Sequence, residues 1–391
     1  MMGVTVVVAL RVVALNWGYG ADLSAYRDAV VAVNAGVNPY VVHTHMNFVY
    51  PPSFLILMGW MSGLSDQVLG GLWQAMLIIS LIGSLLWFLT WKEAMATCLP
   101  AGRPFQEETG WLLVVLTWLF FPVGFALGMG QVSLLLLGLL TLTGYCQSRK
   151  YHTSAGILIG IAGAIKLTPL IWLLVAVKER RYKTVLVGLA TFGGLNLASV
   201  VYYGDAGLWR GFMEVMKASV VNQSVYYFNQ GLPALMYRLG FGNWVWLMTA
   251  LIWAWCWWMM GRVREPWERL ALVAAVATLS ASIAWQHHLV MYLPLIWISF
   301  KKISAKSSLT RWVWWWTVVM LIGMNLKQPE QFASSSLIYN HAVWGGLLLL
   351  AGVGFPPLRR GGLGRGLSKK APACRQAGIP DLVPPEAGKP E

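Results

Sequence analysis

Long apolar runs separated by short polar intervals dominate this chain. Most of the runs approach the length that spans a bilayer, which takes about 20 residues as a helix, but 154–178 is too short for two ordinary spans. The runs lie at 2–17, 49–66, 68–91, 110–127, 131–147, 154–165, 168–178, 183–203, 243–261, 267–284, 287–300, 311–325 and 339–355. They predict an all-α integral membrane protein, a polytopic bundle of about twelve transmembrane helices. Segment 49–66, which opens with Tyr50-Pro51-Pro52, is the one least expected to cross.

Composition agrees with a membrane protein. Only 11% of the residues are charged and 57% are hydrophobic, whereas soluble domains carry about 25% charged residues. The net charge of +14 comes from Lys and Arg in the short intervals between apolar runs, as the positive-inside rule predicts. We therefore explain the positive charge by the orientation of the chain in the membrane, and we expect no nucleic-acid partner. The four cysteines show no metal or redox spacing.

The basic intervals orient the chain, because they are expected on the cytoplasmic side. They are Arg149-Lys150, Lys178–Lys183, Arg262–Arg269, Lys301–Arg311 and Arg359–Lys370. This orientation puts Gly20–Phe48, Lys166, the 204–242 interval and Trp285–His288 on the extracytoplasmic face. We expect a transmembrane domain over residues 1–360 and a disordered, basic cytoplasmic tail over 361–391, since the tail is rich in Gly, Pro, Lys and Arg.

The polar interval Gly20–Phe48 follows the first apolar run and contains the first carboxylates of the chain. Leu23–Ala35 is predicted to form a short helix on the membrane surface, with Asp22 as N-cap and Gly36 at its C-terminal end. A carboxylate beside a low-dielectric cavity also suits a general base, and both roles can hold for Asp22. Asp28 is expected to face water or to pair with Arg27.

The other unusual polar residues are predicted on the same face as Asp22. Ionisable groups at membrane depth are costly and are commonly functional. The set comprises His43, His45, Gln131, Lys166, Asn222, Gln223, His287 and His288.

Lys166 interrupts an apolar run at Lys166-Leu167-Thr168-Pro169. A break of this kind is tolerated where it lines a cavity. The lysine either binds an anion, for which a lipid phosphate is the natural candidate, or snorkels to the surface at the tip of a hairpin.

His287 and His288 lie between two apolar segments. Adjacent side chains on a helix point about 100° apart, and no carboxylate is near in sequence, so a metal site is not expected. Hydrogen bonding to a phosphate or a sugar hydroxyl is one interpretation, and an ordinary interfacial pair is the other. Gly128–Gln131 predicts a tight turn whose glycines permit a hairpin and whose Gln131 amide is able to bind a sugar.

The order and spacing of four short motifs resemble glycosyltransferase family 87, polytopic GT-C enzymes that use polyprenyl-phosphate sugars. The motifs are D-L-S-A-Y at Asp22–Tyr26 with A-G-V-N-P-Y at Ala35–Tyr40 and Y-P-P at Tyr50–Pro52, G-Q-V-S-L-L-L at Gly130–Leu136, A-G-I-L-I-G-I-A-G-A-I-K-L-T-P at Ala155–Pro169, and S-I-A-W-Q-H-H at Ser282–His288. The last motif departs from the family pattern, because Gln286 stands where an acidic residue is common.

The resemblance implies an inverting transferase in the cell membrane, with an extracytoplasmic active-site loop after the first helix. It implies Asp22 as base, and Gln131, Lys166, His287 and His288 as binding residues for the donor phosphate and sugar. The remaining candidates, for contact with the acceptor, are the loop residues Tyr26, Arg27, Asp28 and Tyr40.

The expected reaction moves a sugar, most plausibly mannose, from a polyprenyl-phosphate donor to a lipid or glycan acceptor without a metal or other cofactor. The alternative is a transporter or flippase of a lipid-linked sugar, since a broken helix and a polar cavity suit transport too. A transporter is expected to distribute its ionisable residues through the membrane, whereas here they gather at one face. A glycan ligase is disfavoured, because the 204–242 interval contains no His.

Overall fold

The computed structural model describes residues 20–41, 48–91, 107–223, 228–263, 265–304, 309–324 and 340–353. Within these ranges the fold is all-helical and contains no strand, which confirms the predicted helical class. Several predictions concern residues outside the described ranges: the first apolar run at 2–17, His43, His45 and the tail at 361–391.

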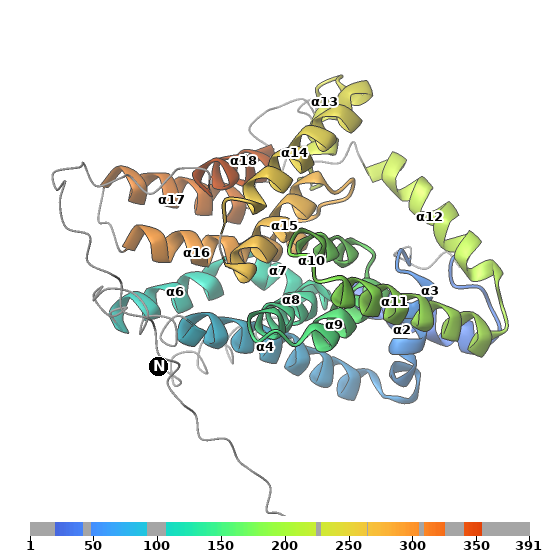
Figure 1. The fold of residues 1–391 in the computed structure, drawn as a ribbon. Helices are drawn as coiled ribbons and strands as arrows, with labels where there is room; N and C mark the ends of the chain where they lie inside the picture. The colour runs from blue at the N-terminus through green and yellow to red at the C-terminus, as the bar shows by residue number, and fades with distance from the viewer. Residues whose placement is uncertain are drawn as a thin grey trace, which may run out of the picture.

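The helices follow the predicted segments closely, with additional short helices between them (Figure 1). They are α2 (Ala21–Asn34), α3 (Pro52–Leu57), η1 (Gly59–Gly63), α4 (Asp66–Trp91), α6 (Glu107–Leu119), α7 (Phe121–Met129), α8 (Ser133–Ser148), α9 (His152–Ile165), η2 (Thr168–Trp172), α10 (Leu173–Lys178), α11 (Tyr182–Tyr203), α12 (Gly207–Gln223), α13 (Leu232–Arg238), η3 (Gly242–Trp244), α14 (Val245–Met260), α15 (Pro266–Ser280), η4 (Gln286–Tyr292), α16 (Leu293–Ser304), α17 (Leu309–Gly323) and α18 (His341–Val353).

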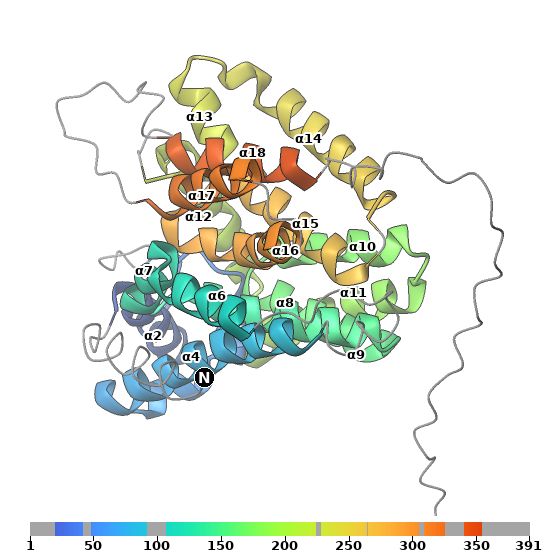
Figure 2. The same ribbon diagram turned by 90° about the vertical axis from the view of Figure 1, so that its left-hand side faces the viewer.

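Helix α15 is the centre of the bundle. It contacts α8, α14, α16, α18, η2 and η4, and Figure 2 shows it in the interior beside α14, α16 and α18. Every side chain from Leu270 to Ala277 is buried. These residues are small or aliphatic, so several helices pack closely around α15.

Two helices are long and apolar enough to cross a membrane by themselves, Asp66–Thr90 and Tyr182–Tyr203. A third candidate is the pair Gly110–Leu119 and Phe121–Met129, which is bent by 50° at Phe120. Several other apolar helices in the described ranges have fewer than 18 residues. The number of about twelve crossings therefore stays a prediction.

Segment 49–66 does not form one long helix. It contains the six-residue α3 and the short 3-10 helix η1, and η1 ends at Gly63. This break agrees with the prediction that segment 49–66 is the one least expected to cross the membrane. The run 154–178 is also broken as predicted, because α9 ends at Ile165 and Lys166 has an extended backbone.

Asp22 is not an N-cap, and this prediction is wrong. Helix α2 begins at Ala21, so Gly20 is the N-cap and the amide of Ser24 already donates to the Gly20 carbonyl over 3.0 Å. Asp22 lies inside the first turn, and its carboxylate is bound by another segment of the chain. The prediction for Gly36 is confirmed, since it follows the helix with a φ of 75°.

The 204–242 interval contains two helices that the apolar pattern did not predict. Helix α12 packs through buried Leu208 and Phe212 onto the segment after α2. The rings of Phe212 and Tyr40 lie 6.0 Å apart. As a result, α12 closes one side of the space between α3 and the rest of the bundle.

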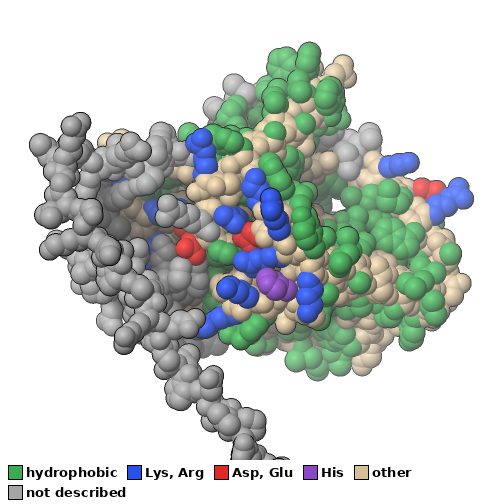
Figure 3. Space-filling model, viewed as in Figure 1, with side chains coloured by type: hydrophobic (Ala, Val, Ile, Leu, Met, Phe, Trp, Pro, Cys, Tyr) green, Lys and Arg blue, Asp and Glu red, His purple; other side chains and the backbone are tan. Residues whose placement is uncertain are grey.

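Three basic turns meet at one end of the molecule. Arg181 donates to the Gln147 carbonyl over 2.8 Å, and Glu179 forms ion pairs of 2.8 Å with both Arg181 and Arg269. Figure 3 shows Lys and Arg side chains gathered around a histidine on this face. The turns lie at the far ends of α8 and α9 from Gln131 and Lys166. A helix as long as α8 measures about 24 Å, so the two polar regions are well separated.

Candidate active site

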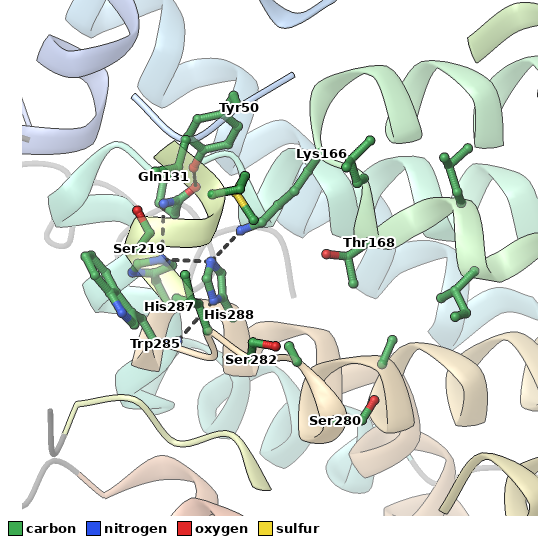
Figure 4. Close-up of a pocket in the computed structure, with 18 of the residues that line it drawn as sticks. Tyr50, Gln131, Lys166, Thr168, Ser219, Ser280, Ser282, Trp285, His287 and His288 are labelled. Atoms are coloured by element: carbon green, nitrogen blue, oxygen red, sulfur yellow. Dashed lines mark hydrogen bonds between the residues drawn. The ribbon is translucent and has the colours of Figure 1, made fainter. Parts of the chain in front are cut away.

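A cavity of about 720 Å³ opens between α2, the α7–α8 turn, the α9–η2 break, η4, α12 and α14. Gln131, Lys166, His287 and His288 point toward one another at one end of it, which we call the polar end (Figure 4). The polar end is lined by Asp22, Tyr26, Tyr50, Gln131, Lys166, His287 and His288. The structure thus brings together the predicted base and all four predicted donor-binding residues.

Gln131 links the separate segments of the polar end. Its side-chain amide donates to Asp22 Oδ2 over 3.0 Å and lies 3.1 Å from His287 Nε2. Gly130 has a left-handed φ of 67° and ends α7. The turn that it makes brings the buried side chain of Gln131 into the site. A side chain at 130 would approach Leu23 Cβ to 2.8 Å, which is why this turn requires glycine.

Two tyrosines fix the orientation of that amide. Gln131 Oε1 lies 2.8 Å from Tyr26 Oη and 3.0 Å from Tyr50 Oη, and both hydroxyls are able to donate to it. The opposite orientation would set the amide oxygen against the Asp22 carboxylate. Both NH₂ hydrogens therefore face Asp22 and His287.

Asp22 is a nearly buried carboxylate, with 6% of its surface exposed. Burial raises its pKa to about 6, although the positive charge of Lys166 and the hydrogen bond from Gln131 act in the opposite direction. A carboxylate with a pKa near neutrality is ionised at physiological pH and still basic enough to accept a proton.

The backbone before η4 holds one side of the His288 ring. The N–H of Trp285 donates to His288 Nδ1 over 3.1 Å. On the other side of the ring, His288 Nε2 lies 2.5 Å from Lys166 Nζ and 3.1 Å from His287 Nε2.

Gln131 sets the tautomer of the next histidine, His287. The Nε2 atom of His287 receives the hydrogen bond from the Gln131 amide, so the proton of this ring is on Nδ1. The ring stacks on Phe125, with centroids 5.9 Å apart. The Nε2 atoms of His287 and His288 lie 3.1 Å apart, although neighbouring side chains on a helix are expected to diverge.

Lys166 lies beside His288 on the wall of the cavity. Lys166 directly follows the carboxyl end of α9, where the helix dipole favours a cation. Its Nζ also lies 5.7 Å from the centre of the Tyr50 ring. The donors of the Lys166 ammonium favour an anionic oxygen in the cavity.

The loop candidates for acceptor contact divide into two groups. Tyr26 lines the cavity. Arg27 instead pairs with Asp66 and donates to the Leu64 carbonyl, so the expected Arg27–Asp28 pair is wrong. Asp28 is exposed, as the water-facing interpretation predicts. Tyr40 donates to the Tyr50 carbonyl over 2.7 Å and supports the site from outside the cavity.

Sequence reasoning missed several residues of the cavity. Tyr50 lies in the Y-P-P motif, from which no role of its side chain was predicted, and it lines the cavity. Met216 and Ser219 come from α12, and Thr249 and Trp253 come from α14. The apolar spacing of Leu208, Phe212 and Met216 could have revealed α12, because positions four apart share one helix face.

Within the described residues no three His, Cys, Asp or Glu side chains gather in a way that could hold a metal ion. The positive charge at the polar end comes from Lys166, and its acidic partner across the cavity is Asp22.

The chain is similar to three curated mannosyltransferases. One is the polyprenol-phosphate-mannose-dependent alpha-(1-2)-phosphatidylinositol mannoside mannosyltransferase of Mycobacterium tuberculosis, 25% identical over 64% of this chain and 61% of that relative. A protein of the same name from Mycolicibacterium smegmatis is 24% identical over 79% of this chain and 74% of its own length. A pentamannoside mannosyltransferase from M. smegmatis is 25% identical over 78% and 74%.

The model of glycosyltransferase family 87 matches residues 48–285. This range includes Gln131 and Lys166. Asp22 precedes it and the two histidines follow it directly, so their place in the site rests on the geometry above. The match covers more than half of the sequence and confirms the predicted resemblance: the chain belongs to glycosyltransferase family 87.

Proposed function

We propose that this chain is a mannosyltransferase that takes its sugar from polyprenyl-phosphate mannose. Family membership supports a glycosyltransferase, and the printed names of the relatives support this donor. The acceptor is a hydroxyl group of an extracytoplasmic lipid or glycan. The transporter alternative is not favoured, since the named relatives are transferases.

One observation carries the proposal: the Asp22 carboxylate and the Lys166 ammonium face the same cavity, and Gln131 and the two histidines connect them. Sugar transfer from a lipid phosphate needs both kinds of group. A base must remove a proton from the acceptor, and hydrogen-bond donors must stabilise the departing phosphate.

In the proposed reaction Asp22 accepts the proton of the acceptor hydroxyl. The acceptor oxygen forms a bond to the anomeric carbon while the bond from that carbon to the phosphate oxygen breaks. The phosphate leaves with the bonding electron pair and is stabilised by the Lys166 ammonium, with His287 and His288 beside it. Attack opposite the leaving group inverts the anomeric configuration.

The test is transfer from labelled polyprenyl-phosphate mannose by purified protein in lipid, with a mixture of membrane lipids as acceptor. We expect label to leave the donor and to appear in an acceptor lipid. Absence of transfer, together with label crossing the bilayer of sealed vesicles unchanged, would support the transporter instead. Loss of activity on chelation that a divalent ion restores would contradict the metal-free mechanism.

A further inference from the structure

Two helical hairpins, α8–α9 and α10–α11, make their turns side by side at one end of the molecule. The Thr184 hydroxyl at the start of α11 donates to the His152 carbonyl at the start of α9 over 3.1 Å. The α14–α15 turn adjoins them, since Arg269 pairs with Glu179. Figure 3 shows Lys and Arg side chains on the surface that these turns form. We call this surface the basic face, and its exposed basic residues are Arg149, Lys150, Arg180, Lys183 and Arg262.

The described acidic residues do not neutralise the basic face. None of them forms an ion pair with any of its five members. Glu179, in the α10–α11 turn, is only 6% exposed and is already paired with Arg181 and Arg269. The two carboxylates at the start of α15 are half-buried, and one of them, Glu268, pairs with Lys302. The exposed positive charges are therefore available to an anion from outside the chain.

The backbone of the two hairpin turns is a second observation. Lys150 and Arg180 have left-handed φ values of 62° and 58°. In each turn the next amide donates to the carbonyl five residues earlier over 2.8 Å, as in a Schellman helix end. Glycine is the usual residue there because it has no Cβ. The other left-handed residues in the described part of the chain also follow helices and are all glycine: Gly36, Gly130, Gly204 and Gly240. A basic side chain is thus kept in both turns despite its strain, which points to a function of its charge.

Aromatic side chains lie around the basic face as they do at a membrane surface. Tyr151 and Tyr182 are exposed beside the two turns. The Arg262 guanidinium lies 3.5 Å from the centre of the Trp258 ring, which is also exposed. Trp and Tyr favour the headgroup level of a bilayer, and clustered Lys and Arg at that level favour anionic headgroups.

We propose that the basic face binds the headgroup of an anionic phospholipid, with Lys150 and Arg180 in contact with its phosphate. The acyl chains lie along the outer side of α11, where Leu186 and Leu189 are exposed about one and two turns into the helix. A soluble anion would make no use of this apolar surface. Binding of the lipid does not require sugar transfer, so the proposal is independent of the proposed function.

Lipid binding is measured by native mass spectrometry of the purified protein, with phosphatidylglycerol or phosphatidylcholine added stepwise. Each basic residue near an anionic surface contributes a factor of about five, so the native protein should prefer phosphatidylglycerol by about tenfold or more. Lys150→Gly combined with Arg180→Gly should lose about fivefold or more of its affinity for phosphatidylglycerol. The thermal midpoint of this variant in phosphatidylcholine should stay the same or rise, because glycine relieves the left-handed backbone.

The matched control is Arg210→Gln combined with Lys217→Gln, which removes the same charge from exposed positions of α12. This control should keep the native affinity for phosphatidylglycerol. The exchange Lys150→Arg with Arg180→Lys keeps both charges in the turns and should also keep it.

Equal affinities of the native protein for the two lipids would overturn the proposal, and so would native affinity in the glycine variant. An equal loss in the α12 control would mean unspecific attraction by net charge and would overturn it as well. Displacement of bound phosphatidylglycerol by millimolar inorganic phosphate would assign the basic face to a soluble anion instead. If the glycine variant does not fold, Lys150→Asn with Arg180→Asn is read in the same way, since asparagine also tolerates the left-handed conformation.

Discussion

The side-chain amide of Gln131 donates to the carboxylate of Asp22 over 3.0 Å, across 109 positions of the chain. This contact joins the helix after the first polar interval to the turn between α7 and α8. The same amide lies 3.1 Å from His287 Nε2. Gln131 therefore sets the positions of the proposed base and of the donor-binding histidines relative to each other.

Replacement of Asp22 tests the base. We expect Asp22→Asn to lower kcat by a factor of about 10² to 10⁴, the range for loss of a general base, without loss of folding. Asp28→Asn is the matched control, because Asp28 lies on the exposed side of the same helix, and it should keep native activity. Equal activity of the two variants would return Asp22 to a structural role.

The raised pKa of Asp22 predicts opposite effects of pH on activity and stability. The base must be ionised, so kcat/KM should rise with pH through about 6. The folded state holds the proton more tightly than the unfolded state, whose carboxyl has a pKa near 3.8. The stabilisation by this group is complete below that value and is lost as pH rises through about 6.

Both pH effects should disappear in Asp22→Asn. The measurements are pH–rate profiles of the native protein, and thermal unfolding of both proteins in lipid between pH 4 and pH 8. An acid limb that persists unchanged in the residual activity of the variant would assign this ionisation to another group.

Gln131→Ala removes the donor that Asp22 and His287 share. A hydrogen bond to a charged group contributes about 1.5–3 kcal/mol, so we expect kcat/KM to fall about tenfold to a hundredfold. Gln147→Ala is the matched control, since Gln147 is as well buried but lies at the other end of α8. The measurement is kcat/KM of both variants by steady-state kinetics. Equal losses of kcat/KM in the two variants would indicate general damage to α8.

Lys166→Met keeps the aliphatic stem and removes the charge beside His288. We expect the KM for the lipid-phosphate donor to rise about tenfold or more, because a charge-assisted hydrogen bond to phosphate is lost. Lys178→Met removes a cation that lies 4.4 Å from the Trp257 ring at the basic turns, and it should leave this KM unchanged. A native KM in Lys166→Met would favour a surface role for the lysine.

Much of the site could be predicted because the membrane topology assigns each polar residue to one face of the membrane. Asp22, Gln131, Lys166 and the two histidines interrupt or separate apolar runs, and the basic intervals assign all of them to one face. The structure brings these five residues to one cavity. The break at Lys166 could also be predicted, since charge and Pro169 interrupt the helical pattern there.

Other features needed three-dimensional information. The difference between an N-cap and a first-turn residue at Asp22 depends on a shift of one or two residues in the helix start, which sequence patterns do not resolve. The position of the His288 ring depends on one backbone amide at Trp285. The hydrogen bonds of Asn229 to Ser282 and Ala284 join residues 53 and 55 positions apart in the chain.

Close packing of α9 against α11 gives a stability prediction with an internal control. A Cβ at Gly160 would lie 2.5 Å from Thr191 Cβ and 2.7 Å from the Gly188 carbonyl oxygen, whereas a Cβ at Gly193 meets nothing within 4 Å. Gly160→Ala must separate the helices and should destabilise the protein by about 1–3 kcal/mol. Gly193→Ala should be neutral or stabilise by up to about 1 kcal/mol, since alanine favours helix. Thermal unfolding in lipid compares them, and equal midpoints would mean that α9 and α11 do not depend on this contact.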